Sequence, residues 1–395
     1  MLTMSSAVRR AAGRQHGAPV VITSLLLVVA CGARSGLLDD GTGTAADAGS
    51  DGSPSGALDA SGSHDSSSPP PSDASLDADD ALDSAGPPPS CAPGGPGLTD
   101  CGPALQNCCA TSPVPAGTYY RTYANDGSGP SGEADPATVT GLRLDTYEVT
   151  VGRFRRFAAA WSAGYRPAPG SGKHVHLHGG LGLANSASPG AYEPGWAPSD
   201  EANVEPTDAA LGSCGIFSTW TPSPGDSENK PIDCVTWPEA YAFCIWDGGF
   251  LPSESEWEFA AAGGSQQREY PWGSADPGTA NQYAIYGCYY EPSDALGQCD
   301  FTAPPGFAPV GTPTLGAGAW GQVDLAGNVW EQTLDSFAAY VDPCDDCAYL
   351  EAGAPKMVRG GSFLSGTTDL MPTARFALAP AIRNNYVGFR CARAP

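Results

Sequence analysis

Basic residues are scarce in this chain of 395 residues, and the scarcity limits what it can bind. The sequence has 19 Lys and Arg against 43 Asp and Glu, which gives a formal net charge of -24. No Lys or Arg occurs between Ser35 and Tyr120. So acidic a surface disfavours nucleic-acid backbones and anionic lipid headgroups as partners. We therefore expect no nucleic-acid partner, and the charge is compatible with divalent cations.

The chain also lacks an apolar run long enough to span a bilayer comfortably. Residues 19–30 are apolar and follow a basic segment with Arg9, Arg10 and Arg14. This pattern is typical of a signal peptide. The run ends in Val-Val-Ala-Cys at Cys31, which resembles the lipobox of bacterial lipoproteins. Residues 1–31 are either a signal peptide whose Cys31 carries the lipid, or an ordinary signal peptide cut nearby. Both interpretations export the protein.

Residues 32–90 are predicted to form a disordered acidic tether. They contain eleven Asp residues among Ser, Gly, Ala and Pro. Such a segment cannot bury enough apolar surface to offset its ordering entropy, and its like charges keep it extended. The tether would hold the folded part away from a bacterial membrane, facing the periplasm or the exterior. We expect the only membrane contact to be the N-terminal lipid, and the protein to be a monomer.

Thirteen cysteines indicate disulfides, because twelve remain beyond Cys31 in an exported chain. Residues 91–112 form a Cys-rich segment with Cys91, Cys101, Cys108 and Cys109. Adjacent cysteines match zinc-ligand spacing poorly, so bridges are favoured there. Two further pairings are guesses at loop staples: Cys214 with Cys234 and Cys288 with Cys299.

A C-x-x-C motif occurs at Cys344 and Cys347. The two Asp residues between them would raise the thiol pKa, and no strand–helix context is evident, which argues against a redox site.

The folded domain is predicted over residues 113–395, and its content of 51 Gly and 38 Pro implies many loops. Residues 141–150 alternate as a strand, and Thr150 can cap a helix that carries Phe154 and Phe157. Two capping boxes, from Thr236 and from Ser253, begin further helices that end at glycine pairs.

Three histidines at His174, His176 and His178 form a candidate transition-metal site. In an extended segment, their period of two would put all three imidazoles on one face. The alternative is an exposed polar loop, because three neighbouring strand positions make a poor cage without a ligand from elsewhere.

The stretch Asp-Leu-Ala-Gly-Asn-Val-Trp-Glu, residues 324–331, has two carboxylates around a glycine bend. Carboxylates and backbone carbonyls are the ligands that Ca²⁺ prefers. Taken alone, the pattern also fits a solvated turn.

Four stretches of the sequence carry a family resemblance: residues 232–264, 324–331, Arg-Gly-Gly-Ser-Phe at 359–363 and Gly-Phe-Arg-Cys at 388–391. Their order along the chain resembles the formylglycine-generating enzyme family, also called the sulfatase-modifying factor family. The resemblance covers about residues 114–395. It implies a loop-rich α+β fold that is related to C-type lectins and has little regular secondary structure.

The resemblance also implies specific sites. Its calcium loop would use the side chains of Asp324 and Glu331 and the carbonyls of Gly327 and Val329. Asn281 matches a ligand of the family's second calcium loop, where Asp300 lies near the later carboxylate without clear register. The family's structural bridge would be Cys244–Cys391, and a groove would be lined by Trp330 and Ser362.

The family's copper-binding cysteines are missing. The resemblance places them at Ser365 and Leu370, and a hydroxyl and an aliphatic side chain cannot bind Cu(I), which selects thiolates. Copper is therefore not expected.

Our leading hypothesis is a calcium-stabilised pseudoenzyme of the cell envelope that binds a peptide, glycan or envelope partner. The alternative is an oxidoreductase that acts on protein cysteine through an altered metal site. A structural envelope protein is the third hypothesis.

Overall fold

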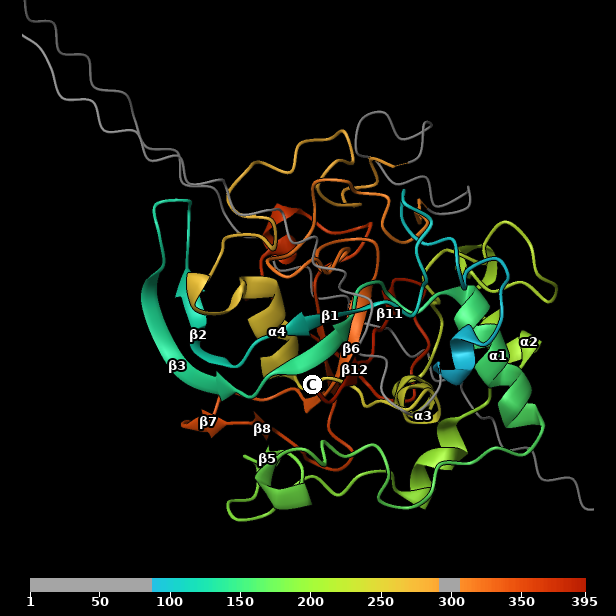
Figure 1. Ribbon diagram of the computed structural model, residues 1–395, viewed down its shortest axis with the longest axis horizontal. Helices are drawn as coiled ribbons and strands as arrows, with labels where there is room; N and C mark the ends of the chain where they lie inside the picture. Colours follow the sequence, from blue (N-terminus) through green and yellow to red (C-terminus); the bar gives the residue numbers. More distant parts are fainter. Residues whose placement is uncertain (1–86, 291–305) are drawn as a thin grey trace, which may run out of the picture. The chain divides into compact units, whose positions relative to one another are not determined.

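The structure, a computed structural model, describes residues 87–290 and 306–395 (Figure 1). The predicted signal peptide, Cys31, nearly all of the tether, Cys299 and Asp300 lie outside these residues. Within the described part of the chain, we find no helix with the length and apolar character needed to cross a membrane.

The regular elements are short and separated by long loops, as the glycine and proline content predicts. The helices are α1 (Val151–Ser162), α2 (Asp208–Leu211), α3 (Trp237–Trp246) and α4 (Glu254–Ala262). The 3₁₀ turns are η1 (Pro89–Cys91), η2 (His178–Gly180), η3 (Pro198–Asn203), η4 (Gly215–Phe217), η5 (Gly264–Gln266) and η7 (Thr367–Leu370). The strands are β1 (Thr111–Val114), β2 (Gly117–Ala124), β3 (Ser131–Val139), β4 (Leu142–Asp145), β5 (Ala184–Asn185), β6 (Trp330–Ser336), β7 (Cys344–Asp345), β8 (Cys347–Ala348), β9 (Lys356–Arg359), β10 (Phe376–Leu378), β11 (Val387–Gly388) and β12 (Ala392–Arg393).

Small sheets join distant parts of the described chain. The largest has the order β10-β9-β6-β11, in which β6 pairs antiparallel with β9 and parallel with β11. Strands β1, β4 and β12 form a second sheet, which brings the C-terminus against the beginning of the domain. Strands β2, β3 and β7 form a third, and β5 pairs with β8. This is the loop-rich α+β fold that the resemblance implies.

The predicted helix starts are confirmed. The Thr150 side chain accepts a hydrogen bond from the Arg153 amide at the start of α1. Helices α3 and α4 each begin with a reciprocal capping box, from Thr236 and from Ser253. Helix α4 ends at Gly263, whose left-handed conformation (φ 68°) suits glycine at this position.

The main core lies between α1 and α3. Phe154 and Phe157 of α1 contact Phe243 of α3, and Phe389 packs edge-on against both helices. The Cys244–Cys391 disulfide ties α3 to the C-terminal segment, as the resemblance implies. A second core forms around Trp257 of α4, which is fully buried.

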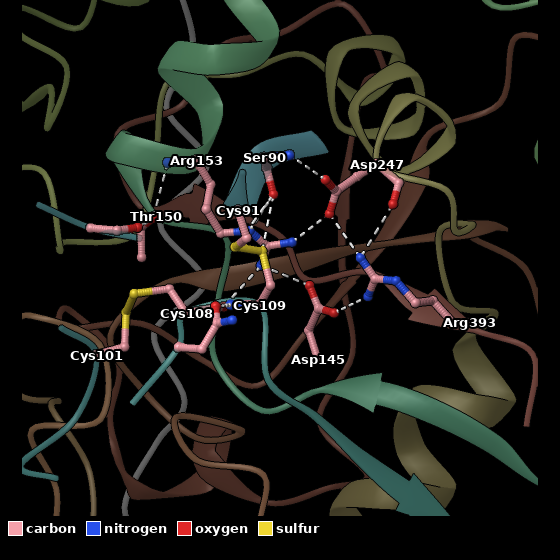
Figure 2. Close-up of a disulfide and its surroundings, with 12 residues drawn as sticks. Ser90, Cys91, Cys101, Cys108, Cys109, Asp145, Thr150, Arg153, Asp247 and Arg393 are labelled. Carbon is pink, nitrogen blue, oxygen red and sulfur yellow. Dashed lines mark hydrogen bonds and ion pairs between the residues drawn. A yellow bond between two sulfur atoms is a disulfide. The ribbon is translucent and has the colours of Figure 1, made fainter. Parts of the chain in front are cut away.

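The Cys-rich segment packs on α1 through a buried ion network (Figure 2). The fully buried guanidinium of Arg153 donates to Asp145 at 2.9 Å and to Asp247 at 2.7 Å. It also donates to the Ser90 hydroxyl at 3.0 Å and to the Cys108 carbonyl at 3.2 Å. Ser90 is fully buried in η1, so the predicted boundary of the disordered tether at residue 90 is wrong. The disulfides in the described residues are Cys91–Cys109, Cys101–Cys108, Cys214–Cys234, Cys244–Cys391 and Cys344–Cys347. The predicted pairing of Cys214 with Cys234 is therefore confirmed.

Candidate functional site

The backbone of the 324–331 loop is tightly bent before it enters β6. Asp324 and Asn328 have left-handed φ angles of 57° and 60°, and Gly327 has a φ of 85°. A side chain at Gly327 would overlap the Ile285 carbonyl. Glycine is therefore required there, because two stretches of backbone approach each other closely.

Three buried carboxylates surround this loop, and one of them was missed by sequence reasoning. Glu331 receives two hydrogen bonds from Arg390, at 2.6 and 2.7 Å, and one from the Trp257 indole at 2.8 Å. Glu148 accepts from the Asn328 side-chain amide and from the Val329 backbone amide. The sequence showed Glu148 only as part of a strand–helix junction.

Asp324 is the least satisfied of the three. Its Oδ2 accepts from the Gly311 amide, while its buried Oδ1 has no hydrogen-bond partner. Burial raises the pKa of Asp324 to about 6. Burial, Asp324 and Glu331 together raise the pKa of Glu148. An added cation would relieve this concentration of negative charge.

Asn281 resembles Asp324 in having an unsatisfied oxygen. It has a left-handed φ of 56°, and its Nδ2 donates to the Tyr289 carbonyl. Its Oδ1 is buried and has no hydrogen-bond partner. Carboxylate and amide oxygens that lack a hydrogen-bond donor are suited to Ca²⁺. Asp324 and Asn281 therefore fit the calcium ions that the resemblance implies.

A cavity of about 370 Å³ opens beside Trp330. Both predicted groove residues, Trp330 and Ser362, line it. The complete lining is Trp330, Ser362, Leu364, Ser365, Gly366, Asp369, Arg375, Phe376 and Tyr386. We call this cavity the Trp330 pocket.

The two positions that the resemblance assigns to copper ligands, Ser365 and Leu370, have structural roles here. The Ser362 amide donates to the Ser365 hydroxyl oxygen at 3.0 Å, which braces a turn in the wall of the Trp330 pocket. Leu370 is 1% exposed and packs in an apolar cluster with Tyr270 and Tyr286. Neither side chain provides a thiolate, so these residues do not fit copper.

Arg375 is a pocket residue that sequence reasoning missed. Its guanidinium donates to Glu254 at 2.6 and 2.8 Å, and it lies 4.1 Å from the centre of the Tyr340 ring. Glu254 is the first residue of α4, 121 positions away, so no local pattern joins the two. The pair fixes a positive group in the pocket wall.

The expectation of an extended histidine face is wrong. Residues 174–178 form a turn, and His178 has a φ of 46°. Both ring nitrogens of His174 are bound by carboxylates, Nδ1 to Glu193 at 2.8 Å and Nε2 to Glu256 at 3.1 Å. His178 Nδ1 instead pairs with the Gly182 carbonyl.

The surroundings of His174 favour a charged imidazole. Burial opposes its protonation, but Glu256 and Glu193 outweigh burial and raise the pKa of His174 to about 10. Burial lowers the pKa of His176. Among the described residues, no group of three His, Cys, Asp or Glu side chains is arranged to hold a metal ion.

The chain is similar to known proteins of one family. The model of the sulfatase-modifying factor enzyme 1-like domain matches residues 99–395. The formylglycine-generating enzyme of Mus musculus is 30% identical over 309 residues, 75% of this chain and 78% of that protein. Inactive C-alpha-formylglycine-generating enzyme 2 of Bos taurus is 30% identical over 168 residues, 41% of this chain and 50% of that protein. The structure of PvdO from Pseudomonas aeruginosa aligns with a TM-score of 0.45 and 21% identity, covering 77% of this chain and 100% of that one.

Proposed function

Because this chain belongs to the family of sulfatase-modifying factor enzyme 1-like domains, we propose that it is a member diverged from cysteine-to-formylglycine oxidation that binds a peptide in the Trp330 pocket. One observation carries the proposal. The pocket has kept its tryptophan and serine walls, while the positions of the two copper thiolates hold Ser365 and Leu370. A relative that is named as inactive shows that the family includes such members.

The chemistry of the Trp330 pocket suits a peptide segment. Trp330, Phe376 and Tyr386 give it apolar walls for a side chain. Arg375 and Asp369 supply one charge of each sign. The Ser365 hydroxyl uses its oxygen to accept from Ser362 and keeps its own hydrogen to donate. Mixed apolar and polar walls of this kind are typical of binding sites.

The loss of oxidase activity can be tested directly. The purified, disulfide-bonded protein is supplied with Cu(I), O₂ and a sulfatase-type cysteine peptide, and mass spectrometry follows the cysteine. We expect no formylglycine above a control without protein. A matched variant carries both Ser365→Cys and Leu370→Cys, and should gain Cu(I) binding because it restores two thiols. Conversion by the unaltered protein would contradict the proposal.

Peptide binding needs its own measurement. An array of peptides of varied sequence is probed with the protein and with two variants. Trp330→Ala should weaken the selected peptides by about tenfold or more, as expected for a central aromatic contact. Trp320→Ala should leave peptide binding unchanged, because the Trp320 indole stacks on Phe259 and does not line the pocket. Binding that is equally insensitive to both changes would place the peptide elsewhere.

We also propose that calcium binds the 324–331 loop and stabilises the domain. The partnerless Oδ1 of Asp324, the raised pKa of its carboxyl group and the bent backbone support this. Glu331 is already paired with Arg390, so it would contribute less charge than the sequence suggests.

Export and lipid anchoring at Cys31 belong to the same proposal. The disulfides support export, because such bridges persist in oxidising compartments. Incorporation of a labelled fatty acid, abolished by Cys31→Ser, would test the anchor.

A further inference from the structure

A second cavity, of about 450 Å³, lies between η3, the start of α3, β6 and the loop before β9. It shares no lining residue with the Trp330 pocket. Its walls combine aromatic, acidic and basic side chains, which include Asp200, Trp237, Tyr241, Leu334, Glu351 and Lys356. We call it the Lys356 cavity.

The amine of Lys356 is held at the wall by weak partners. Its Nζ donates to the Leu334 carbonyl at 3.0 Å and lies 4.0 Å from the centre of the Trp237 ring. Within the described part of the chain, no carboxylate comes within ion-pair distance of this amine. A lysine ammonium has three donors, so one carbonyl and a ring face leave it incompletely bound.

The surroundings of Lys356 make its ammonium easier to deprotonate than that of an ordinary lysine. Burial lowers the pKa of Lys356 to about 8, although Asp335 and Asp200 oppose this. Burial also raises the pKa of Asp200, which lines the same cavity. Desolvation of a lysine lowers the pKa of its amine, which makes the amine a better nucleophile near neutral pH.

The charge of the cavity argues against an anionic ligand. Lys356 is the one basic residue among its lining residues, which also include Asp200 and Glu351, and Asp335 adds a further negative charge nearby. Glu193 also lines the cavity, but its carboxylate is bound to His174. Trp237 and Tyr241 supply flat apolar walls. A neutral, apolar molecule therefore fits better than a carboxylate or phosphate.

We propose that the Lys356 cavity binds a neutral aldehyde, which forms an imine with Nζ of Lys356. The nitrogen lone pair attacks the carbonyl carbon and gives a carbinolamine. The carbon–oxygen bond then breaks as the carbon–nitrogen double bond forms, and the oxygen leaves as water with both amine hydrogens. Nothing is oxidised or reduced. We assign the proton transfers during loss of water to Asp200, because it lines the same cavity. This proposal does not depend on peptide binding in the Trp330 pocket.

The chain offers an internally controlled test, because it has three lysines, Lys173, Lys230 and Lys356, all of them half-buried. The full protein is incubated with benzaldehyde and sodium cyanoborohydride, which reduces an imine to a stable secondary amine. Peptide mapping then locates the benzyl groups. At about pH 7.5, we expect Lys356 to be labelled about tenfold faster than Lys173 or Lys230.

Two further measurements separate a built site from general reactivity. In denaturing urea the three lysines should react at similar rates, and in native Lys356→Met the labelling of Lys173 and Lys230 should be unchanged. Benzyl alcohol should slow labelling of Lys356 by competition, whereas benzoate should not. Equal labelling of all three lysines in the native protein, or no labelling of Lys356, would overturn the imine. Protection by benzoate alone would overturn the preference for a neutral ligand.

Discussion

Single buried residues in this protein carry charges that their neighbours must balance. Asp324 has one carboxylate oxygen bound and one without a partner. Asp324, Glu148 and Glu331 form a cluster whose charge is offset by Arg390. His174 is the opposite case, because both of its ring nitrogens are bound by carboxylates. The first arrangement lacks positive charge and the second is complete. They therefore lead to different expectations for cation binding and for pH.

Calcium should raise the stability of the unaltered protein, and Asp324→Ala should abolish that increment. At a concentration about 100 times Kd, a ligand that binds only the folded state adds about 2.7 kcal/mol. The variant also loses the Gly311 hydrogen bond, so it should be less stable in chelator as well. The increment, measured as the difference in Tm between calcium and chelator, is therefore the quantity to compare. The control variant Asp335→Asn, in β6, should keep the calcium-dependent increase in Tm. If that increase persists in Asp324→Ala, calcium does not bind through Asp324.

His174→Gln should destabilise the protein and flatten its alkaline pH dependence. The folded pKa is about 10, above the usual value of about 6.5. The ion pairs therefore contribute fully below about pH 6.5, and the contribution is lost as pH rises through about 10. Removing one partner of a buried charged group costs about 3–5 kcal/mol.

Urea unfolding across this pH range would measure the effect. His178→Gln is the control, because the His178 imidazole makes one hydrogen bond to a backbone carbonyl. This variant should lose about 1 kcal/mol of unfolding free energy and keep the pH dependence of the wild type. Equal slopes for the wild type and His174→Gln would show that the imidazole is not charged in the folded state.

At the scale of elements, a buried ion network joins the helices in addition to their apolar contacts. Helix α1 presents Arg153 to Asp247 at the end of α3 and to Asp145 at the end of β4. Arg393 of β12 completes the network by pairing with the same two aspartates. Ser90 of η1 and Cys108 of the Cys-rich segment also join the network (Figure 2). One arginine thus orients four segments.

Arg153→Leu should lower the free energy of unfolding by about 3–5 kcal/mol, because it leaves buried carboxylates with less positive charge. Arg156→Leu, on the same helix, removes a hydrogen bond to the Pro93 carbonyl and should cost about 0.5 kcal/mol. Denaturant unfolding of both variants measures the difference. Similar losses would mean that the buried network stabilises no more than a surface contact.

At the scale of the whole domain, long-range bridges compensate for short elements. Strand β4, for example, is four residues long, and it pairs with β12 at the far end of the chain. The Cys244–Cys391 bridge has a sequence separation of 147, whereas Cys344–Cys347 has a separation of 3. A bridge that closes a long loop removes more entropy from the unfolded chain.

Replacing both Cys244 and Cys391 by Ala should therefore cost about 5 kcal/mol on the loop-entropy scale, and replacing Cys344 and Cys347 about 1.6 kcal/mol. Thermal unfolding under oxidising conditions would rank the two variants. The reverse ranking would show that local packing around the short bridge outweighs loop closure.

The sequence by itself determined the features that depend on neighbouring residues or on motif order. The capping positions Thr150, Thr236 and Ser253 are confirmed because a cap joins groups three residues apart. The family was recognisable from the order of its motifs, and with it the Cys244–Cys391 bridge and the walls at Trp330 and Ser362. The prediction that Ser365 and Leu370 stand at the family's two copper positions came from a count along the chain.

The tertiary structure decided which charged groups meet. His174 lies 82 positions from Glu256, and Arg375 lies 121 positions from Glu254, so no local spacing joins either pair. Residues 174–178 form a turn and not the expected strand, because the His174 ring binds the buried carboxylates of Glu193 and Glu256. Lys356 acquires its cavity in the same way, from α3, η3 and β6 together. A buried charge requires a partner, and only the path of the chain determines which partner lies within reach.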